Sequence, residues 1–265
     1  MKRKKLGFAL GAGGSRGVAH IGFLKAMEEN GIKPDFVAGT SMGSVVGACY
    51  CAGYSADFMH EEIIKLTMSD IFDLSLNPLG NGALLRAQKM RKKLASYFTE
   101  FPTFNQLKTP FRSVAVDLWT GNLKVFQGDE DVSEGIAASS TIPGIFKAIE
   151  KEDMTLVDGG IKCRVPVEQV REMGAEVVVA VDVLGGIRPQ AKKYNIFSLM
   201  FRTFDIMDAE LTKYKIKSQK PDFYISPNLG DMDPYRFKLL ENAYIAGYEV
   251  GKENADKIKK AIGMK

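Results

Sequence analysis

Residues 6–17 read L-G-F-A-L-G-A-G-G-S-R-G, an apolar stretch that runs directly into a cluster of glycines. The apolar part, Leu6–Leu10, is typical of a buried strand, and residues 17–30 have the apolar spacing of a helix. A second short strand is expected at 36–38, followed by a helix of small apolar residues at 41–52. This βαβα order predicts a parallel sheet covered by helices.

The pattern continues to alternate beyond this opening. Ser55 is a suitable N-cap for a helix that runs to about Leu66. The Val-rich run at 176–184 is typical of a strand buried on both faces. The remaining expected elements are a hairpin of 112–118 with 122–126, strands at 155–157 and 222–225, a basic helix at about 84–98, and one or two closing helices within 235–262.

Length and composition are those of an ordinary globular protein. The chain has 265 residues, of which 45% are hydrophobic and 26% are charged. A domain of this size buries roughly 70–75% of the surface of its unfolded chain, so it needs no disulfide or metal to stabilise its core. The net charge of +4 is too small to indicate a nucleic-acid partner. We therefore expect one large domain.

Neither the cysteines nor the N-terminus indicates export. Cys49, Cys51 and Cys163 are odd in number and lack the spacing of zinc ligands, so we expect reduced core thiols in a cytoplasmic protein. The basic start resembles a signal peptide, but residues 6–12 contain glycines and no A-x-A-like cleavage site follows. No run approaches the ~18 apolar residues of a membrane span.

Gly39-Thr40-Ser41-Met42-Gly43 fits the pattern G-x-S-x-G where the second strand passes into a helix. This is the position that a nucleophile elbow occupies, because glycines on both sides of the serine permit a very tight turn. The serine would then lie at the carboxyl edge of the sheet, near the positive end of the following helix. A glycine-rich turn that enters a closely packed helix explains the same residues, and the pattern alone favours neither interpretation.

The loop Gly11–Gly17 is suited to bind an anion, because successive glycines let several backbone N–H groups converge. That anion is either a phosphate or the transient oxyanion of acyl transfer. A dinucleotide site also expects an acidic residue at the end of the second strand, where Gly39 and Thr40 stand instead. No G-K-[ST] follows the glycines, so a P-loop is excluded. Nucleotide binding is the weaker alternative.

A serine nucleophile needs a base, and the sequence contains only two histidines. His20 shares a helix face with apolar residues and is expected to be a packed core residue, whereas His60 is expected at the surface. Carboxylates are the alternative. Asp117 and Asp182 have apolar neighbours on both sides and are expected to be structural, while Asp158 is followed at once by two glycines that let another loop approach it.

The glycine-rich loop, the G-x-S-x-G and the D-G-G, in this order and at these separations, resemble the patatin-like phospholipase family, especially its bacterial branch. The resemblance covers about 6–170 and includes A-S-S-T-I-P-G-I-F at 138–146. It implies an α/β fold, a three-layer α/β/α sandwich with a mainly parallel central sheet. We expect a single domain of this type over 1–265, with C-terminal strand and helices at 176–265. The irregular segment in the middle of the chain indicates a possible helical lid at 67–110.

The resemblance also implies the roles of individual residues. Ser41 would be the nucleophile and Asp158 the proton acceptor, without a histidine, a metal or a cofactor. The amides of Gly13 and Gly14 would form the oxyanion hole. Ala12 stands where the family has glycine, and alanine does not adopt a positive φ at low cost. Supporting roles fall to Arg16, which would hold the loop or attract an anionic head group, and to Gly39, Gly43 and Gly159.

These features together predict a serine acyl hydrolase of the phospholipase A, lysophospholipase or carboxylesterase type. The alternatives are a catalytically idle relative that binds a lipid or a partner and, less favoured, a nucleotide-binding protein. A lipid-like acyl ester substrate is suggested by the resemblance and by an apolar middle segment, although core or dimer contacts also explain that segment; its residues are Met68, Ile71, Phe72, Leu74, Leu76 and Leu79. A basic helix is suited to dock on anionic membrane, although a solvated face is the commoner meaning of such a run; its basic residues are Arg86, Lys89, Arg91, Lys92 and Lys93.

Overall fold

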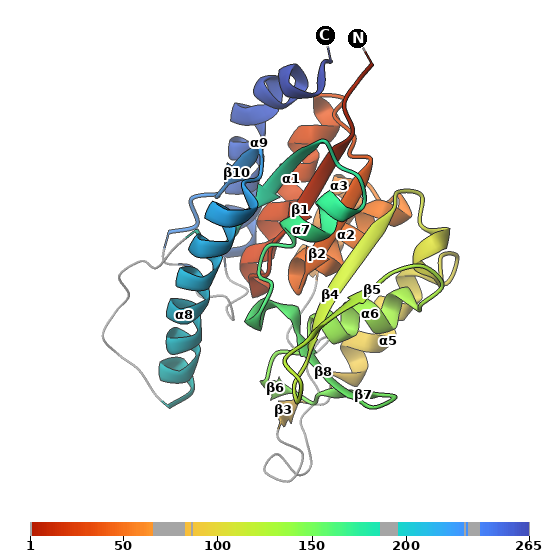
Figure 1. Cartoon of the computed structure of the whole chain (residues 1–265), viewed down its shortest axis with the longest axis vertical. Helices are drawn as coiled ribbons and strands as arrows, with labels where there is room; N and C mark the ends of the chain where they lie inside the picture. The colour runs from red at the N-terminus through yellow and green to blue at the C-terminus, as the bar shows by residue number, and fades with distance from the viewer. Residues whose placement is uncertain are drawn as a thin grey trace.

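The computed structural model describes residues 2–65, 83–85, 87–185, 196–230, 232 and 239–264. Within these residues, a mixed eight-stranded sheet lies between helices on both faces (Figure 1). The strands follow the order β10 (Phe223–Ile225), β9 (Val177–Val181), β1 (Leu6–Leu10), β2 (Phe36–Thr40), β4 (Phe111–Asp117), β8 (Met154–Asp158) and β7 (Ile149–Lys151), and β5 (Leu123–Phe126) pairs with β4.

The five strands from β10 to β4 are all parallel, which confirms the predicted α/β architecture. Strand β4 then pairs antiparallel with both β5 and β8, and β7 pairs antiparallel with β8. The sheet is therefore parallel where the glycine-rich loop and the G-x-S-x-G lie, and antiparallel where the D-G-G lies. A separate two-stranded sheet joins β3 (Ala83–Leu85) to β6 (Gly144–Phe146).

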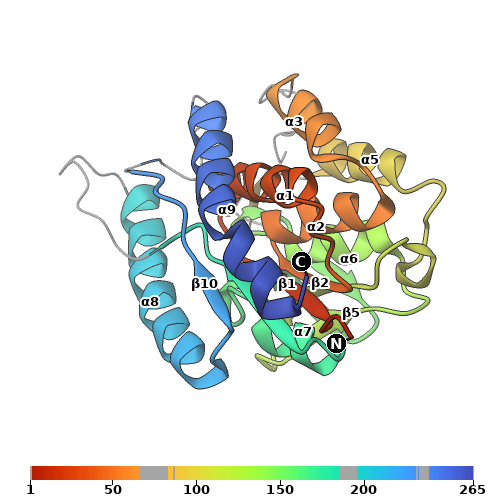
Figure 2. The ribbon, with the colours of Figure 1, turned by 90° about the horizontal axis from the view of Figure 1, so that it is seen from above.

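The helices form the two outer layers, as Figure 2 shows from above. One face carries most of them, and the opposite face carries α7, with α8 beside it. The first group consists of α1 (Val18–Glu29), α2 (Met42–Ala52), α3 (Ala56–Lys65), α5 (Gln88–Tyr97), α6 (Val132–Ser139) and α9 (Leu240–Ile262). The second consists of α7 (Val167–Glu172) and α8 (Ile196–Gln219), and the short 3-10 helices are η1 (Gly14–Gly17), η2 (Phe104–Gln106) and η3 (Gly159–Ile161).

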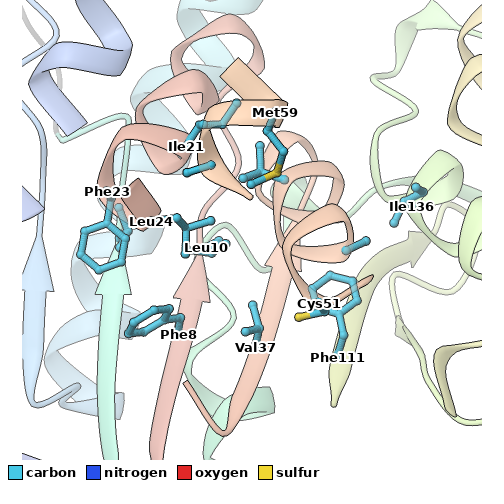
Figure 3. Close-up of a cluster of buried hydrophobic side chains, with 14 of the residues drawn as sticks. Phe8, Leu10, Ile21, Phe23, Leu24, Val37, Cys51, Met59, Phe111 and Ile136 are labelled. Carbon is cyan, nitrogen blue, oxygen red and sulfur yellow. The ribbon is translucent and has the colours of Figure 1, made fainter. Parts of the chain in front are cut away.

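Alternation along β1 explains why the two faces differ. Successive side chains of a strand point to opposite faces, so Phe8 and Leu10 pack against α1 and α2, as Figure 3 shows. Gly7 and Ala9 face α7 instead, and a Cβ added to Gly7 would collide with the side chain of Val170. Large residues on one face and small ones on the other thus let α7 approach the sheet closely.

The C-terminal helix α9 packs tightly on α1. A Cβ at Gly22 of α1 would collide with the carbonyl oxygen of Tyr244, and one at Gly247 of α9 with that of Ala19. The two helices therefore approach each other with their backbones nearly in contact. The predicted closing helix is confirmed as α9, Leu240–Ile262, and residues 235–238 of the predicted range lie outside the described residues.

Most expected elements are found close to their predicted positions. Ser55 caps α3, since its Oγ accepts the N–H of Phe58 at 3.2 Å. The predicted hairpin is β4 with β5, and the basic helix is shorter than expected, at Gln88–Tyr97. Helices α6, α7 and α8 were not predicted. Residues 67–82 and 86 of the predicted lid at 67–110 lie outside the described residues, and they include Arg86 and the apolar residues named above. The lid therefore stays a prediction.

Candidate active site

Ser41 lies in the turn between β2 and α2 with φ 55° and ψ −125°, a backbone conformation that is unusual for a residue with a side chain. A Cβ at Gly39 would collide with the carbonyl oxygen of Gly43, and one at Gly43 with that of Leu10. Both glycines are therefore required by close backbone approach. This tight strand-turn-helix geometry favours the nucleophile elbow over an ordinary glycine-rich turn.

The structure brings Ser41 and Asp158 together across 117 positions of the chain. The Ser41 hydroxyl donates a hydrogen bond to Oδ2 of Asp158 at 2.5 Å, and both residues are only 5% exposed. Oδ1 of Asp158 accepts the N–H of Gly160 at 2.7 Å. Each carboxylate oxygen thus has a donor, and the oxygen that faces Ser41 is aligned to accept a proton.

Burial raises the pKa of Asp158 from its ordinary value of 3.8 to about 6, because desolvation penalises the charged form. The hydrogen bonds from Ser41 and Gly160 and the charge of Arg164 lower the pKa and so oppose this effect. The carboxylate of Asp208 raises it further. Asp158 is therefore ionised at neutral pH and is a stronger base than an exposed aspartate.

The two glycines after Asp158 also lie in tight surroundings. A Cβ at Gly159 would collide with the carbonyl oxygen of Val114 on β4, and one at Gly160 would lie 3.2 Å from the Cβ of Ala12. The D-G-G turn is thus packed against both the sheet and the glycine-rich loop. The predicted supporting role of Gly159 has a plain steric reason.

The glycine-rich loop follows β1 and passes into η1 and α1. Gly14 has φ 54°, and a Cβ at Gly13 would collide with Val183. The N–H groups of Gly13 and Gly14 donate to no acceptor among the described residues. Ala12 does not have a positive φ, so its replacement of the family's glycine causes no backbone strain.

Arg16 is directed into the protein and is 7% exposed. Its Nε donates to the carbonyl oxygen of Met232 at 2.8 Å, and Nη1 lies 3.9 Å from Asp205 of α8. Of the two roles that the resemblance implied, these contacts favour support of the loop over attraction of a head group.

The histidines lie where the sequence predicted. His20 is fully buried, and its Nε2 donates to the carbonyl oxygen of Gly11 at 2.8 Å. Burial lowers the pKa of His20 to about 4, so the ring is neutral and helps to hold the glycine-rich loop. His60 stacks on Tyr244 and pairs with Glu241 at 2.8 Å, on the outside of the molecule.

Asp117 and Asp182 are structural, as predicted. Asp117 accepts the N–H of Thr155 at 3.1 Å and the hydroxyl of Thr120 at 2.5 Å, at the turn after β4. Asp182 accepts the N–H of Leu184 at 3.0 Å and the hydroxyl of Tyr224 at 2.6 Å. Both aspartate side chains therefore form hydrogen bonds near the ends of their own strands.

Sequence reasoning missed two residues that contact this site. The Oγ of Ser139, at the end of α6, accepts the N–H of Ser41 at 2.9 Å. Arg164 contacts Ala12 of the glycine-rich loop through both its side chain and its backbone. Ser139 lies within the stretch 138–146 that carried the family resemblance. Nothing in the local sequence around Arg164 indicates its partners.

Three further features of the described residues concern the cysteines, the possible metal ligands and the length and polarity of the helices. Cys49, Cys51 and Cys163 are free thiols, and the last two are buried, as the sequence predicted for core cysteines. Within the described ranges, no group of three or more His, Cys, Asp or Glu side chains is arranged to hold a metal ion. No helix in those ranges combines the length and the apolar character that crossing a bilayer requires.

Comparison with known proteins adds independent findings. A family model described as patatin-like phospholipase matches residues 8–171, close to the range of 6–170 that the motifs indicated. An uncharacterized NTE family protein of Mycobacterium tuberculosis is 34% identical over 68% of this chain and 49% of its own length. A lysophospholipase of Coccidioides immitis is 27% identical over 98% of this chain and 18% of its own length.

Among solved structures, VipD from Legionella pneumophila aligns with 97% of this chain and 67% of that chain, with a TM-score of 0.49 and 10% sequence identity. The chain spans about half the length of the mycobacterial relative, 49%, and a much smaller part of the fungal one, 18%.

Proposed function

This chain belongs to the patatin-like phospholipase family, and from that membership and the geometry above we propose that it is a serine acyl hydrolase that cleaves lipid acyl esters. One observation carries the proposal: the Ser41 hydroxyl donates to Asp158 at 2.5 Å from a strained turn at the carboxyl end of β2. A buried carboxylate and a buried hydroxyl in such contact are typical of a nucleophile and its base.

In the proposed mechanism, Ser41 Oγ attacks the ester carbonyl carbon while Asp158 Oδ2 accepts the hydroxyl proton. The tetrahedral intermediate then collapses, and the leaving alcohol departs with that proton. In the second half, Asp158 takes a proton from water as the water attacks the acyl-enzyme. The acid is released and Ser41 recovers its proton.

The oxyanion of both tetrahedral intermediates would be held by the amides of Gly13 and Gly14. Their N–H groups lack acceptors among the described residues, and the adjacent loop is held by Arg16, His20 and Arg164. Donors that are already oriented need no reorganisation when charge develops, and one such donor contributes ~10²- to 10³-fold in rate.

The substrate class follows from the relatives. A relative of Coccidioides immitis carries the name lysophospholipase, so a lysophospholipid is the first lipid to test. We also propose a cytoplasmic location with peripheral contact to the inner face of an anionic membrane. The free cysteines and the exposed lysines Lys89 and Lys92 of α5 support this location and this contact.

A fluorophosphonate probe tests the nucleophile directly. The wild type should be labelled covalently, and Ser41→Ala should not. Ser140→Ala is the matched control, because Ser140 is a neighbouring serine that is 8% exposed and whose Oγ has no hydrogen-bond partner among the described residues. Equal labelling of Ser41→Ala would refute the assignment. An unlabelled wild type that still binds lysophospholipid would instead indicate the catalytically idle relative.

A further inference from the structure

Helix α8 lies outside the segment that the family model matches, 8–171, yet it contacts the candidate active site from the side. Figure 2 shows it at the edge of the molecule, beyond β10. Asp208 of α8 forms an ion pair with Arg164. About two turns later, Lys215 donates from Nζ to the carbonyl oxygen of Lys162 at 2.5 Å, in the turn that follows Asp158.

Arg164 connects this helix to the glycine-rich loop. Its Nη2 donates to the carbonyl oxygen of Ala12 at 2.9 Å, and its own carbonyl oxygen accepts the N–H of Ala12 at 3.0 Å. Arg164 thus binds both the backbone N–H and the backbone carbonyl oxygen of Ala12. Because Ala12 directly precedes Gly13, this pair of bonds sets the direction in which the following amides point.

The guanidinium of Arg164 is held in place by buried charge. Arg164 is 7% exposed, and besides its ion pair with Asp208 its Nε lies 3.5 Å from Oδ1 of Asp182. Asp182 is itself held by Leu184 and Tyr224. Removing one carboxylate partner leaves part of a buried arginine charge uncompensated, which costs folding free energy. The position of Arg164 therefore depends on Asp208.

We propose that Arg164 and Asp208 are positioning residues, which brace the glycine-rich loop against α8 and so hold the Gly13 and Gly14 amides toward the oxyanion. This inference rests on the proposed function, since it assigns the loop an oxyanion. It makes the oxyanion hole dependent on a helix that is not part of the matched family segment.

The same pair acts electrostatically on Asp158. Besides burial, the groups that shift the pKa of Asp158 are the Ser41 hydroxyl, the Gly160 N–H, Arg164 and Asp208. Arg164 lowers the pKa of Asp158 and Asp208 raises it. Loss of the arginine charge should therefore move the acidic limb of kcat/KM to higher pH, and loss of the Asp208 charge should move it to lower pH. A purely structural role would not give opposite shifts.

The test compares Arg164→Met, Arg164→Lys, Asp208→Asn and Asp208→Glu on a short p-nitrophenyl ester. We expect kcat to fall by about 10²-fold in Arg164→Met and by about tenfold in Asp208→Asn, with KM nearly unchanged, because misplaced donors weaken transition-state binding. Arg164→Lys and Asp208→Glu should recover part of the loss. Glu172→Gln is the control, because it removes an ion pair with Arg112 that does not contact the site.

Hydrogen exchange of the peptide 10–17 provides a measurement that does not need activity. Exchange in this peptide should become faster in Arg164→Met and Asp208→Asn and stay unchanged in Glu172→Gln. Unchanged exchange and unchanged kcat in folded variants would overturn the inference. If the wild type fails to react with the fluorophosphonate while the exchange differences are present, the proposed function is wrong. The positioning of the glycine-rich loop by Arg164 and Asp208 would still be supported.

Discussion

At the scale of single residues, the candidate site depends on how a carboxylate is made to act as a base. An exposed aspartate has a pKa of about 3.9 and accepts protons poorly at neutral pH. Asp158 is a better base because burial raises its pKa. Three groups lower the pKa and so keep this increase moderate: the hydroxyl of Ser41, the N–H of Gly160 and the charge of Arg164. The balance leaves it ionised near pH 7 and still basic enough to accept a proton.

The pH dependence of kcat/KM follows from this balance. Asp158 must be ionised to act, and its pKa is about 6, so kcat/KM should fall as the pH drops through 6 and level off above about 7. Below the pKa, the decline should approach about tenfold per pH unit. His20 titrates at about 4 and is buried, so it does not set this limb.

Steady-state kinetics on a neutral ester between pH 4.5 and 8.5 provide the measurement, with circular dichroism to show that the protein stays folded. His20→Asn is the control, and its limb should stay near pH 6. A limb that follows His20, or a kcat/KM that is constant down to pH 5, would contradict the role of Asp158 as base.

The sequence indicated which glycines matter because each lies beside a motif residue: Gly39 and Gly43 flank Ser41, and Gly159 follows Asp158. The backbone atoms that a Cβ at Gly43 or Gly159 would meet, those of Leu10 and Val114, are brought there only by the fold.

Arg164 was missed because the local sequence around it indicates none of its partners. Its partners Ala12, Asp182 and Asp208 come from three other parts of the chain, and only folding brings them within reach.

At the scale of elements, close helix packing depends on residues without side chains. Helices α1 and α9 touch at Gly22 and Gly247, where any Cβ would collide with the carbonyl oxygen of the other helix. Such contact fixes the position of α1, whose N-terminal end adjoins the glycine-rich loop. The C-terminal helix therefore stabilises the candidate site from a distance.

Substitution of Gly247 by alanine tests this packing. The added methyl group would collide with the backbone of Ala19, so the helices must separate, which we expect to cost about 1–3 kcal/mol of the free energy of unfolding. Intrinsic helix propensity favours alanine over glycine, so a simple gain in stability would show that the contact is loose. Urea denaturation provides the measurement.

The control is Lys252→Ala, at an exposed position of the same helix, which should change the free energy of unfolding by less than about 0.5 kcal/mol. Equal effects of the two substitutions would mean that the α1–α9 contact is not the cause.

Helices α6, α7 and α8 are the ones that the sequence analysis did not predict. Helix α7 has only six residues, too few to show a period. Helix α6 begins at Val132 and is capped by Asp131, whose side chain accepts the N–H of Glu134 at 2.7 Å, and this N-cap pattern was a usable signal. Helix α8 shows no clean stripe because apolar residues also occupy its exposed face, among them Leu199, Met200, Phe204, Ile206 and Met207.

At the scale of the whole molecule, the sheet gathers the site from segments that are far apart in the chain. Strands β1 and β2 are parallel neighbours, so the loops after them meet at one edge. Strand β8 is antiparallel to β4 and ends with Asp158 opposite Ala115. The carboxylate therefore reaches Ser41 across β4, which no pattern within β8 could indicate.

The proposed contact with anionic membrane predicts that vesicle binding depends on ionic strength. Lys89 and Lys92 are exposed on α5, and each lysine near an anionic surface contributes about 1 kcal/mol. A double substitution of both by glutamine should weaken binding to phosphatidylserine-containing vesicles by about ten- to thirtyfold. Raising the salt should have a similar effect, because it shortens the Debye length from about 30 Å at 0.01 M to about 8 Å at 0.15 M.

Vesicle co-sedimentation measures this binding, with neutral phosphatidylcholine vesicles as the reference. Lys252→Gln with Lys257→Gln is the matched control, because it removes the same charge from exposed positions of α9. Binding that is insensitive to salt, or that weakens equally in both double variants, would reject α5 as the electrostatic contact.

The sequence alone determined the local features of this protein: the first strand and its loop, the serine turn, the D-G-G, and the parallel order of the opening elements. These depend on neighbours within a few residues, where apolar periodicity and glycine act directly. Only the tertiary structure decided how Ser41 reaches Asp158, a pairing that the family resemblance had implied, and that Arg164 holds Ala12. Each of these two contacts joins residues more than 100 positions apart, and burial in a shared core is what brings their polar groups within bonding distance.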